Sequence, residues 1–194
     1  ASDVYKRQDV DCILEKNTLI KLIKPFMDEE TTKIKEVGDP CIECGFQHIK
    51  EDYRKVIAVG ATLRMVNSCE VDEGLITRVK PPQKLLPRFQ EMEYIRAFVL
   101  GKMGWDFINS VPNVSGGLGM FDKDVAIKAG GYDSKSFGED MDLITRMGSY
   151  MRVHDRKYAV RYVPETLCWT EGPTTLKVFG RQRSRWSRGL AQIM

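Results

Sequence analysis

The fold of this chain is decided by an apolar stretch in its first third, Val56-Ile57-Ala58-Val59-Gly60-Ala61-Thr62-Leu63-Arg64-Met65-Val66. The stretch is rich in β-branched residues, which favour strands, and one glycine, Gly60, interrupts it. It therefore predicts either one bent strand or a pair of strands.

A short helix is predicted upstream of this stretch. Apolar residues recur there at helical spacing from Asn17 onward, and Pro25 stops or bends the pattern. Downstream, a loop is marked by Pro81, Pro82 and Pro87. A second helix should follow this loop, pack its apolar stripe on the core and end at Gly101. The stripe consists of Phe89, Met92, Ile95 and Val99.

The next segment begins with a loop of small residues at positions 113–120. A short helix is expected around residues 125–127, because the pair Gly130 and Gly131 would end it. A further helix is predicted over residues 141–147.

The last segment is predicted as a strand followed by a helix. Residues 158–163 alternate between apolar and polar side chains, and Pro164 should stop that strand. Thr174 or Thr175 can cap the final helix. Helices and strands thus alternate along the whole chain, which favours an α/β domain.

Composition and charge bound the possible functions. The 194 residues are 42% hydrophobic and 29% charged, enough for the core of one domain, which excludes disordered, collagen-like and disulfide-scaffold proteins. The last 24 residues hold five cations and one acid, a net charge of +4, whereas the whole chain carries +3. A nucleic-acid-binding domain spreads positive charge over a face of the whole domain, whereas here it is confined to the last segment. We therefore expect no nucleic-acid partner.

The chain lacks an apolar run near the roughly 20 residues that cross a bilayer, and its first eight residues are unlike a signal peptide. We therefore expect it to be soluble as it stands. Its five cysteines are an odd number, which favours a reducing compartment over a disulfide framework. Cys41, Cys44 and His48 have part of the spacing of a zinc site, but with no second pair nearby an ordinary loop is preferred.

Three polar motifs could carry chemistry, and the first is Asp9-Val10-Asp11. In an extended segment the two carboxylates would point the same way and could share one Mg²⁺ or Mn²⁺ ion. Two solvated acids on a loop are the alternative. The second motif, Gly138-Glu139-Asp140-Met141-Asp142, places acids at the start of a predicted helix. These acids could stabilise the helix terminus, or one of them could be a general base that takes a proton from a sugar hydroxyl.

The third motif is Gln182-Arg183-Ser184-Arg185-Trp186 in the basic tail. On a helix Gln182, Arg185, Trp186 and Gly189 share one face. This face offers an amide, a guanidinium for phosphate, an aromatic ring for a sugar, and a glycine that permits close approach. An exposed basic helix that meets anionic lipid or nucleic acid is the alternative.

The order of the motifs resembles the inverting family 2 glycosyltransferases, above all the membrane-embedded synthases of cellulose, hyaluronan, chitin and poly-N-acetylglucosamine. The resemblance runs from Asp9 to the end of the chain. It rests on the three motifs above and on Ser115-Gly116-Gly117-Leu118-Gly119-Met120-Phe121, Gly130-Gly131-Tyr132-Asp133 and Thr170-Glu171. The implied fold is the C-terminal, acceptor-side part of a Rossmann-like GT-A domain, of α/β class and with a mixed sheet.

The resemblance also implies roles for individual residues. Asp9 and Asp11 would hold Mg²⁺ or Mn²⁺ on the donor diphosphate, and Asp140, with Glu139 beside it, would be the general base. The remaining implied substrate-binding residues are Gln182 and Arg185 at the diphosphate, Trp186 stacked on the acceptor sugar, and Ser115, Gly116 and Gly117 in the small-residue loop. The donor would be a nucleotide sugar, with UDP as the expected nucleotide, and the acceptor a growing saccharide.

Residues 1–8 depart from the family, because Tyr5-Lys6-Arg7-Gln8 is polar where members have an apolar strand. We therefore expect residues 1–8 to be a lead unlike the family and residues 9–194 to be a partial catalytic domain. A nucleotide-binding half and membrane helices would lie outside this chain. The full-length protein would act at the cytoplasmic face of the cell membrane, and the chain alone would be inactive. Two alternatives stay open: a non-processive family 2 enzyme acting on a lipid- or protein-linked acceptor, and a non-enzymatic basic module that binds membrane or nucleic acid.

Overall fold

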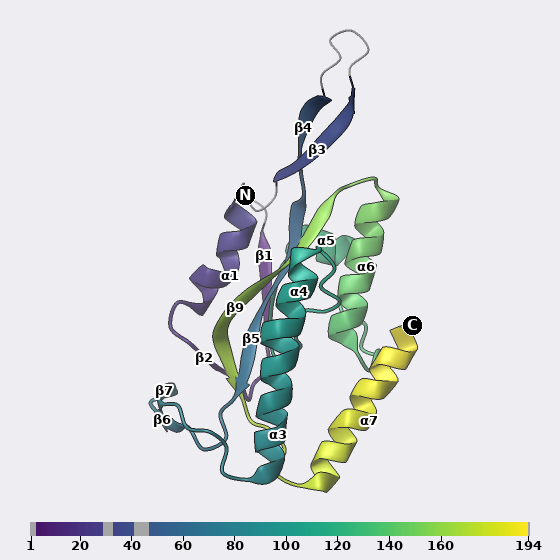
Figure 1. Cartoon of the computed structure of the whole chain (residues 1–194). Coiled ribbons are helices and arrows are strands. Elements are labelled where there is room, and N and C mark those ends of the chain that lie inside the picture. The colour runs from purple at the N-terminus through teal and green to yellow at the C-terminus, as the bar shows by residue number, and fades with distance from the viewer. Residues whose placement is uncertain (1–2, 29–32, 41–46, 194) are drawn as a thin grey trace.

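A computed structural model describes residues 3–28, 33–40 and 47–193. Its centre is a five-stranded mixed sheet with helices packed against it (Figure 1). In spatial order the strands are β1 (Val4–Gln8), β8 (Leu118–Asp122), β5 (Lys55–Met65), β9 (Tyr158–Thr170) and β2 (Ile13–Leu14). Within the described part of the chain, no helix combines the length and the apolar character needed to cross a bilayer.

The apolar stretch quoted above forms a single strand, β5, at the centre of the sheet. It pairs in parallel with β9 and antiparallel with β8, so both of its edges are hydrogen-bonded. Its residues are buried from Val56 to Leu63. The interior glycine, Gly60, allows a close approach, because a Cβ at this position would lie 3.2 Å from the Val114 side chain. Of the two readings of this stretch, the single strand is confirmed.

Strand β9 is longer than its sequence predicts, and the prediction that Pro164 ends it is wrong. The pairing with β5 shifts register between Ala61 and Thr62, where β9 advances from Val163 to Thr166. Pro164 lies in this irregularity, where its missing N–H removes no ladder bond, and its carbonyl accepts a hydrogen bond from Thr62 Oγ1 at 2.9 Å. The strand β8 is likewise missed by the sequence, which assigned Leu118 to Met120 to a loop.

The helix predicted to end at Gly101 continues through it. It comprises α3 (Leu85–Tyr94), a π-helical segment η1 (Ile95–Gly101) and α4 (Lys102–Phe107). The Lys102 N–H donates to the Ala97 carbonyl, five residues back. Pro87 belongs to the first turn of α3 rather than to the preceding loop, since a proline is tolerated where the N–H has no helical partner.

The apolar stripe of this helix faces outward, which overturns the expectation that it packs on the core. Phe89 is 59% exposed and Met92 62% exposed. The buried face instead carries Gln90, Glu91 and Tyr94. Glu91 is buried because its carboxylate accepts from the Met65 main-chain N–H at 2.8 Å and pairs with Arg64. Hydrogen bonds to β5 therefore decide which face of the helix turns inward.

The sequence predicts the other helices at the right places, but the predicted ranges are shorter than the observed ones. They are α1 (Thr18–Met27), with Pro25 inside its last turn, α5 (Lys123–Lys128), α6 (Glu139–Val153) and α7 (Leu176–Ile193). Thr175 begins α7, since its Oγ1 accepts from the Val178 N–H at 3.5 Å. Two hydrophobic clusters flank the sheet; Leu22 of α1 belongs to one, and Leu143 and Met147 of α6 to the other.

Two hairpins extend from this body: β3 (Lys33–Pro40) with β4 (Gln47–Tyr53), and β6 (Glu70–Asp72) with β7 (Leu75–Arg78) (Figure 1). Of the partial zinc-like spacing, His48 belongs to β4, and Cys41 and Cys44 lie outside the described residues. The three cysteines that are described, Cys12, Cys69 and Cys168, are free thiols.

Candidate active site

The first acidic motif lies on a turn between β1 and β2. The Cys12 N–H donates to the Asp9 carbonyl at 3.2 Å, so Asp9 and Asp11 stand on a tight turn and not on the extended segment assumed from their spacing. Both side chains are exposed. The Asp9 N–H donates to the Gly117 carbonyl at 3.2 Å, which ties this turn to the small-residue loop.

The small-residue loop lies between the two acidic motifs, and its glycines permit that placement. A Cβ on Gly117 would lie 2.6 Å from Leu63 Cδ2 and 3.5 Å from Cys12 Sγ, so a larger residue would collide with β5. A Cβ on Gly116 would lie 3.7 Å from Asp140 Oδ2. The loop therefore contacts the Asp9 turn at Gly117 and lies beside Asp140 at Gly116.

The second acidic motif starts α6, as predicted, and its two acids have different partners. Glu139 forms an ion pair with Arg7 at 2.7 Å. Burial raises the pKa of Glu139, but the Arg7 hydrogen bond and the charges of Arg7 and Arg185 lower it overall. Asp140 forms no such ion pair with another described residue: its Oδ1 accepts from the Met141 N–H at 2.9 Å and its Oδ2 from Asn113 Nδ2 at 3.4 Å. Asp140 is thus the carboxylate better placed to accept a proton from a ligand.

Charges of both signs meet around Asp9. Burial raises the pKa of Asp9, the nearby charge of Arg7 lowers it, those of Asp11 and Glu139 raise it, and that of Arg185 lowers it. The fold therefore brings the first motif, the second motif and Arg185 of the third within electrostatic reach of one another. Among the described residues, no three His, Cys, Asp or Glu side chains converge as a complete metal-binding group.

Helix α7 is held against the start of α6 by two glycines. Gly189 is the buried residue of α7, and a Cβ on it would lie 2.8 Å from both the Cα and the N of Gly138. The Phe137 N–H also donates to Gln192 Oε1 at 3.0 Å. The predicted close approach at Gly189 is real, but the approaching group is the main chain that precedes Glu139 and not a ligand.

The side chains of the third motif have different surroundings: some are bound to other parts of the fold and others are exposed. Arg183, the arginine outside the shared face, makes two hydrogen bonds of 2.5 and 2.6 Å to the Glu93 carboxylate of α3. Its guanidinium lies between the Phe179 and Trp186 rings, 4.7 and 4.5 Å from their centroids. Trp186 remains 38% exposed, and Gln182 Oε1 is buried without a hydrogen-bond partner among the described residues. The Glu93 contact spans 90 positions, so no local spacing in the sequence could have predicted it.

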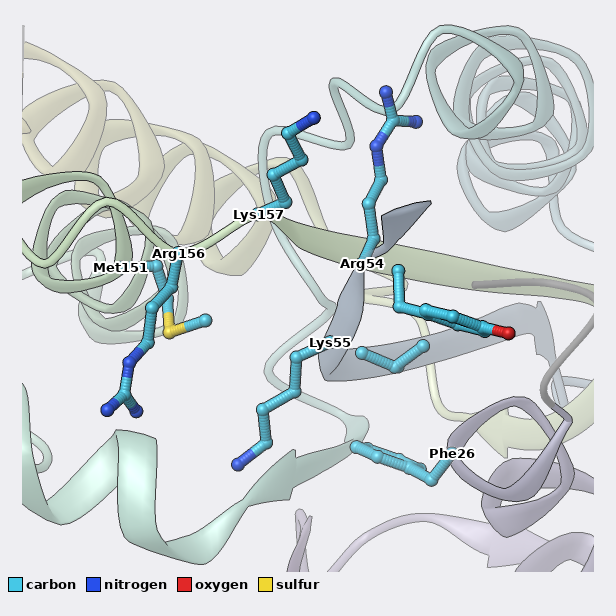
Figure 2. A pocket seen from close by; sticks show the side chains of 8 residues that line it. Phe26, Arg54, Lys55, Met151, Arg156 and Lys157 are labelled. Carbon is cyan, nitrogen blue, oxygen red and sulfur yellow. The ribbon is translucent and has the colours of Figure 1, made fainter. Parts of the chain in front are cut away.

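Two cavities help to locate the site. One, of about 440 Å³, opens beside the second motif and is lined by Tyr5, Arg7, Tyr132, Asp133, Ser134, Ser136 and Glu139. The other, of about 460 Å³, lies at the start of β5, and Figure 2 shows its basic lining of Arg54, Lys55, Arg156 and Lys157 around Phe26 and Met151. None of the motif residues lines this basic cavity. The first cavity and the adjoining acids therefore form the candidate active site.

Comparison with known proteins identifies the family of the chain. Residues 92–194 match the family described as glycosyl transferase family group 2. The chain is 31% identical over 119 residues to a probable glycosyltransferase, YdaM, of Bacillus subtilis, and the match covers 60% of this chain and 26% of that protein. It is 26% identical over 117 residues to the poly-beta-1,6-N-acetyl-D-glucosamine synthase of Staphylococcus aureus, a match covering 60% of this chain and 27% of the synthase.

The aligned segment spans about a quarter of the length of these relatives. The family match overturns the alternative of a non-enzymatic basic module, because it covers both the acids of α6 and the basic helix α7. The mixed sheet agrees with the GT-A type of domain. This chain, an α/β domain with a mixed sheet, belongs to glycosyl transferase family group 2.

Proposed function

We propose that this chain is the acceptor-side part of an inverting glycosyltransferase that moves a sugar from a nucleotide-linked donor to a growing saccharide. Residues 9–194 would supply the general base and the groups around the diphosphate, and residues 1–8 would be a lead unlike the family. The observation that carries the proposal is that the small-residue loop connects the two acidic motifs, with Gly117 bonded to Asp9 and Gly116 beside Asp140.

In the proposed reaction Asp140 accepts the proton of the acceptor hydroxyl while that oxygen attacks the anomeric carbon. A new C–O bond forms on one face of the sugar. The bond to the donor diphosphate breaks on the other face, and its electron pair leaves with the diphosphate, so the configuration is inverted. Asp140 suits this role because its carboxylate lies beside the glycine loop and, unlike Glu139, pairs with no arginine of the described chain.

The leaving diphosphate needs positive charge, and the site offers two sources of it. Asp9 and Asp11 fit Mg²⁺ or Mn²⁺, since such an ion is typically held by one or two carboxylates together with substrate phosphates. The pKa of Asp9 is raised by burial first, is lowered by the charge of Arg7, and is raised again by the charges of Asp11 and Glu139, which a bound cation would offset. When bound, the ion would neutralise charge on the departing diphosphate. Arg185 would lie on the same group, with Gln182 beside it, and Trp186 would stack on the acceptor sugar.

The name of the Staphylococcus aureus relative suggests polysaccharide synthesis, with N-acetylglucosamine as the first donor sugar to test. UDP stays the expected nucleotide. Such an enzyme would act at the cytoplasmic face of the cell membrane, to which segments outside this chain would attach it. A non-processive enzyme acting on a lipid- or protein-linked acceptor is the second candidate, because YdaM is named only as a probable glycosyltransferase. The length of the product made by the full-length enzyme distinguishes the two.

The decisive experiment is Asp140→Asn in the full-length enzyme, with transfer from UDP-N-acetylglucosamine and UDP-glucose as the readout. The variant should lose transfer by about 10² to 10⁴-fold, since it lacks the base, and should still bind UDP. The matched control is Asp124→Asn, which removes an exposed acid from the first turn of α5 and should leave transfer unchanged. Transfer at the wild-type rate in Asp140→Asn would refute the assignment of the base.

A further inference from the structure

The basic cavity at the start of β5 concentrates positive charge away from the acidic motifs. Its volume of about 460 Å³ lies within the range of small-molecule sites. Half of its eight lining residues are cations and none is an acid; the cations are Arg54, Lys55, Arg156 and Lys157. The glycine loop of the proposed active site, by contrast, packs against Leu63 near the other end of β5. The cavity and the proposed active site are therefore separate places in the fold.

The parallel pairing of β5 with β9 brings the four cations together. An arginine followed by a lysine stands at the start of β5, and a second such pair directly precedes β9. The Lys55 N–H donates to the Lys157 carbonyl at 3.1 Å, so the two pairs lie side by side although they are far apart in the sequence. Successive residues of an extended chain point to opposite sides. Accordingly, Figure 2 shows one cation of each pair extending to one side of the strands and its neighbour extending to the other.

The apolar part of the lining connects the two faces of the sheet. Phe26 belongs to α1 and packs on one hydrophobic cluster, whereas Met151 belongs to α6 and to the other cluster. Val56, buried at the start of β5, lies in the first of these clusters. The basic cavity thus reaches both faces at the end of the sheet, and its cations surround an apolar floor.

The positive charge of the cavity is only partly balanced by the fold. Lys55 pairs with the buried carboxylate of Asp122 at 2.8 Å, but Arg54 and Arg156 pair with no acid among the described residues. The carboxyl end of α6 attracts positive charge, which accounts for one cation and not for four. General basicity does not account for them either, because the first 170 residues together carry a charge of −1. Cations gathered in a cleft raise the local concentration of anions.

We propose that the basic cavity binds a soluble anion with two or more phosphate groups. A guanidinium group can donate two parallel hydrogen bonds to the oxygens of one phosphate. Cations on both sides of the apolar floor favour a ligand with more than one such group. This site is independent of the proposed function, because none of the motif residues lines the cavity.

The test is calorimetric titration of the full-length enzyme with inorganic pyrophosphate, in EDTA so that no metal ion carries the binding. We expect saturable binding, which the double substitution of Arg54→Gln with Arg156→Gln weakens by about tenfold or more. The matched control is Arg152→Gln, which removes an exposed arginine from the last turn of α6 outside the cavity and should change the Kd by less than about twofold. If the double variant does not fold, the two single variants replace it.

Two further arms identify the site and the kind of anion. Arg185→Gln removes the guanidinium proposed for the donor diphosphate, and it should leave the Kd of pyrophosphate nearly unchanged. Inorganic phosphate and a dissolved short-chain phosphatidylglycerol, each with a single phosphate, should bind more weakly than pyrophosphate.

Four results would overturn the inference. They are no saturable binding at millimolar pyrophosphate, equal weakening by Arg152→Gln, weakening by Arg185→Gln in place of the double variant, and tighter binding of the lipid than of pyrophosphate. The first two would reveal no site or a general attraction to surface charge, and the last two would assign the anion to the donor site or to a lipid headgroup. None of them bears on the proposed function, which the rate of Asp140→Asn tests separately.

Discussion

Replacement of Gly189 by alanine tests whether the contact between α7 and the start of α6 sets the geometry of the site. A Cβ at Gly189 would lie 2.8 Å from main-chain atoms of Gly138, whereas ordinary carbon contacts are 3.5–4.0 Å. The helix must therefore shift by roughly 0.7 Å or more, and strain of this kind costs about 1–3 kcal/mol. Alanine returns about 1 kcal/mol through its better helix propensity. We expect a net loss of up to about 2 kcal/mol in the free energy of unfolding.

The same helix offers a control of opposite sign. Gly180 lies inside α7, and nothing stands within 4 Å of the place its Cβ would take. Gly180→Ala should therefore raise the free energy of unfolding by about 1 kcal/mol, while Gly189→Ala lowers it. Urea unfolding followed by circular dichroism measures both. In the full-length enzyme Gly189→Ala should also reduce transfer, because Arg185 lies one turn before Gly189. Equal stabilisation by the two substitutions would show that α7 is not pressed against Gly138.

Three further predictions concern charge. Lys102 is buried beside the Tyr162 ring, and burial lowers its pKa to about 8. Between pH 8 and 10.5 the Lys102 side chain binds a proton in the unfolded chain but not in the folded chain. Its contribution to the free energy of unfolding should therefore rise by about 3 kcal/mol over that interval. Urea titrations at several pH values should show this rise in the wild-type chain and lose it in Lys102→Met. Glu93→Gln should free Arg183 and loosen Trp186, raising the acceptor KM several-fold at nearly constant kcat; an unchanged KM would separate Trp186 from acceptor binding. Asp9→Asn should weaken Mn²⁺-dependent binding of UDP to the full-length enzyme by about tenfold or more in calorimetry, with no effect if the metal is held elsewhere.

Local patterns in the sequence predicted the elements of this fold better than their extents. The apolar run around Gly60 and the cap at Thr175 depend on neighbours in the chain, and both predictions are confirmed. The end of β9 was misjudged because Pro164 lies at a register shift that only the pairing with β5 creates. In α3 the apolar stripe suggested the wrong face, since the hydrogen bond from the Met65 N–H to Glu91 decides the orientation and no periodicity encodes it.

For the motifs of the site, too, local spacing was predictive and contacts between distant residues were not. Spacing placed Arg185 and Gly189 on one face of a helix; Gly189 packs against Gly138 at the start of α6, and the charge of Arg185 lowers the pKa of Glu139. Spacing could not show that Arg183 is engaged by Glu93, or that Asn113 donates to Asp140, because these partners are 90 and 27 positions apart. The burial of Lys102 was equally hidden, because a lone lysine after a glycine carries no signal of its depth.

The π-helical segment η1 determines the direction, around the helix axis, in which the side chains of α4 point. Each residue of an α-helix turns the chain by about 100°, so the additional residue in the loop from Ala97 to Lys102 rotates α4 by that angle relative to α3. Deleting one residue between positions 95 and 101 would restore a regular helix and turn the Lys102 side chain away from Tyr162. The π-helical turn therefore shifts the phase of the helix, so the number of residues between positions 95 and 101 decides where the charge of Lys102 lies in the core.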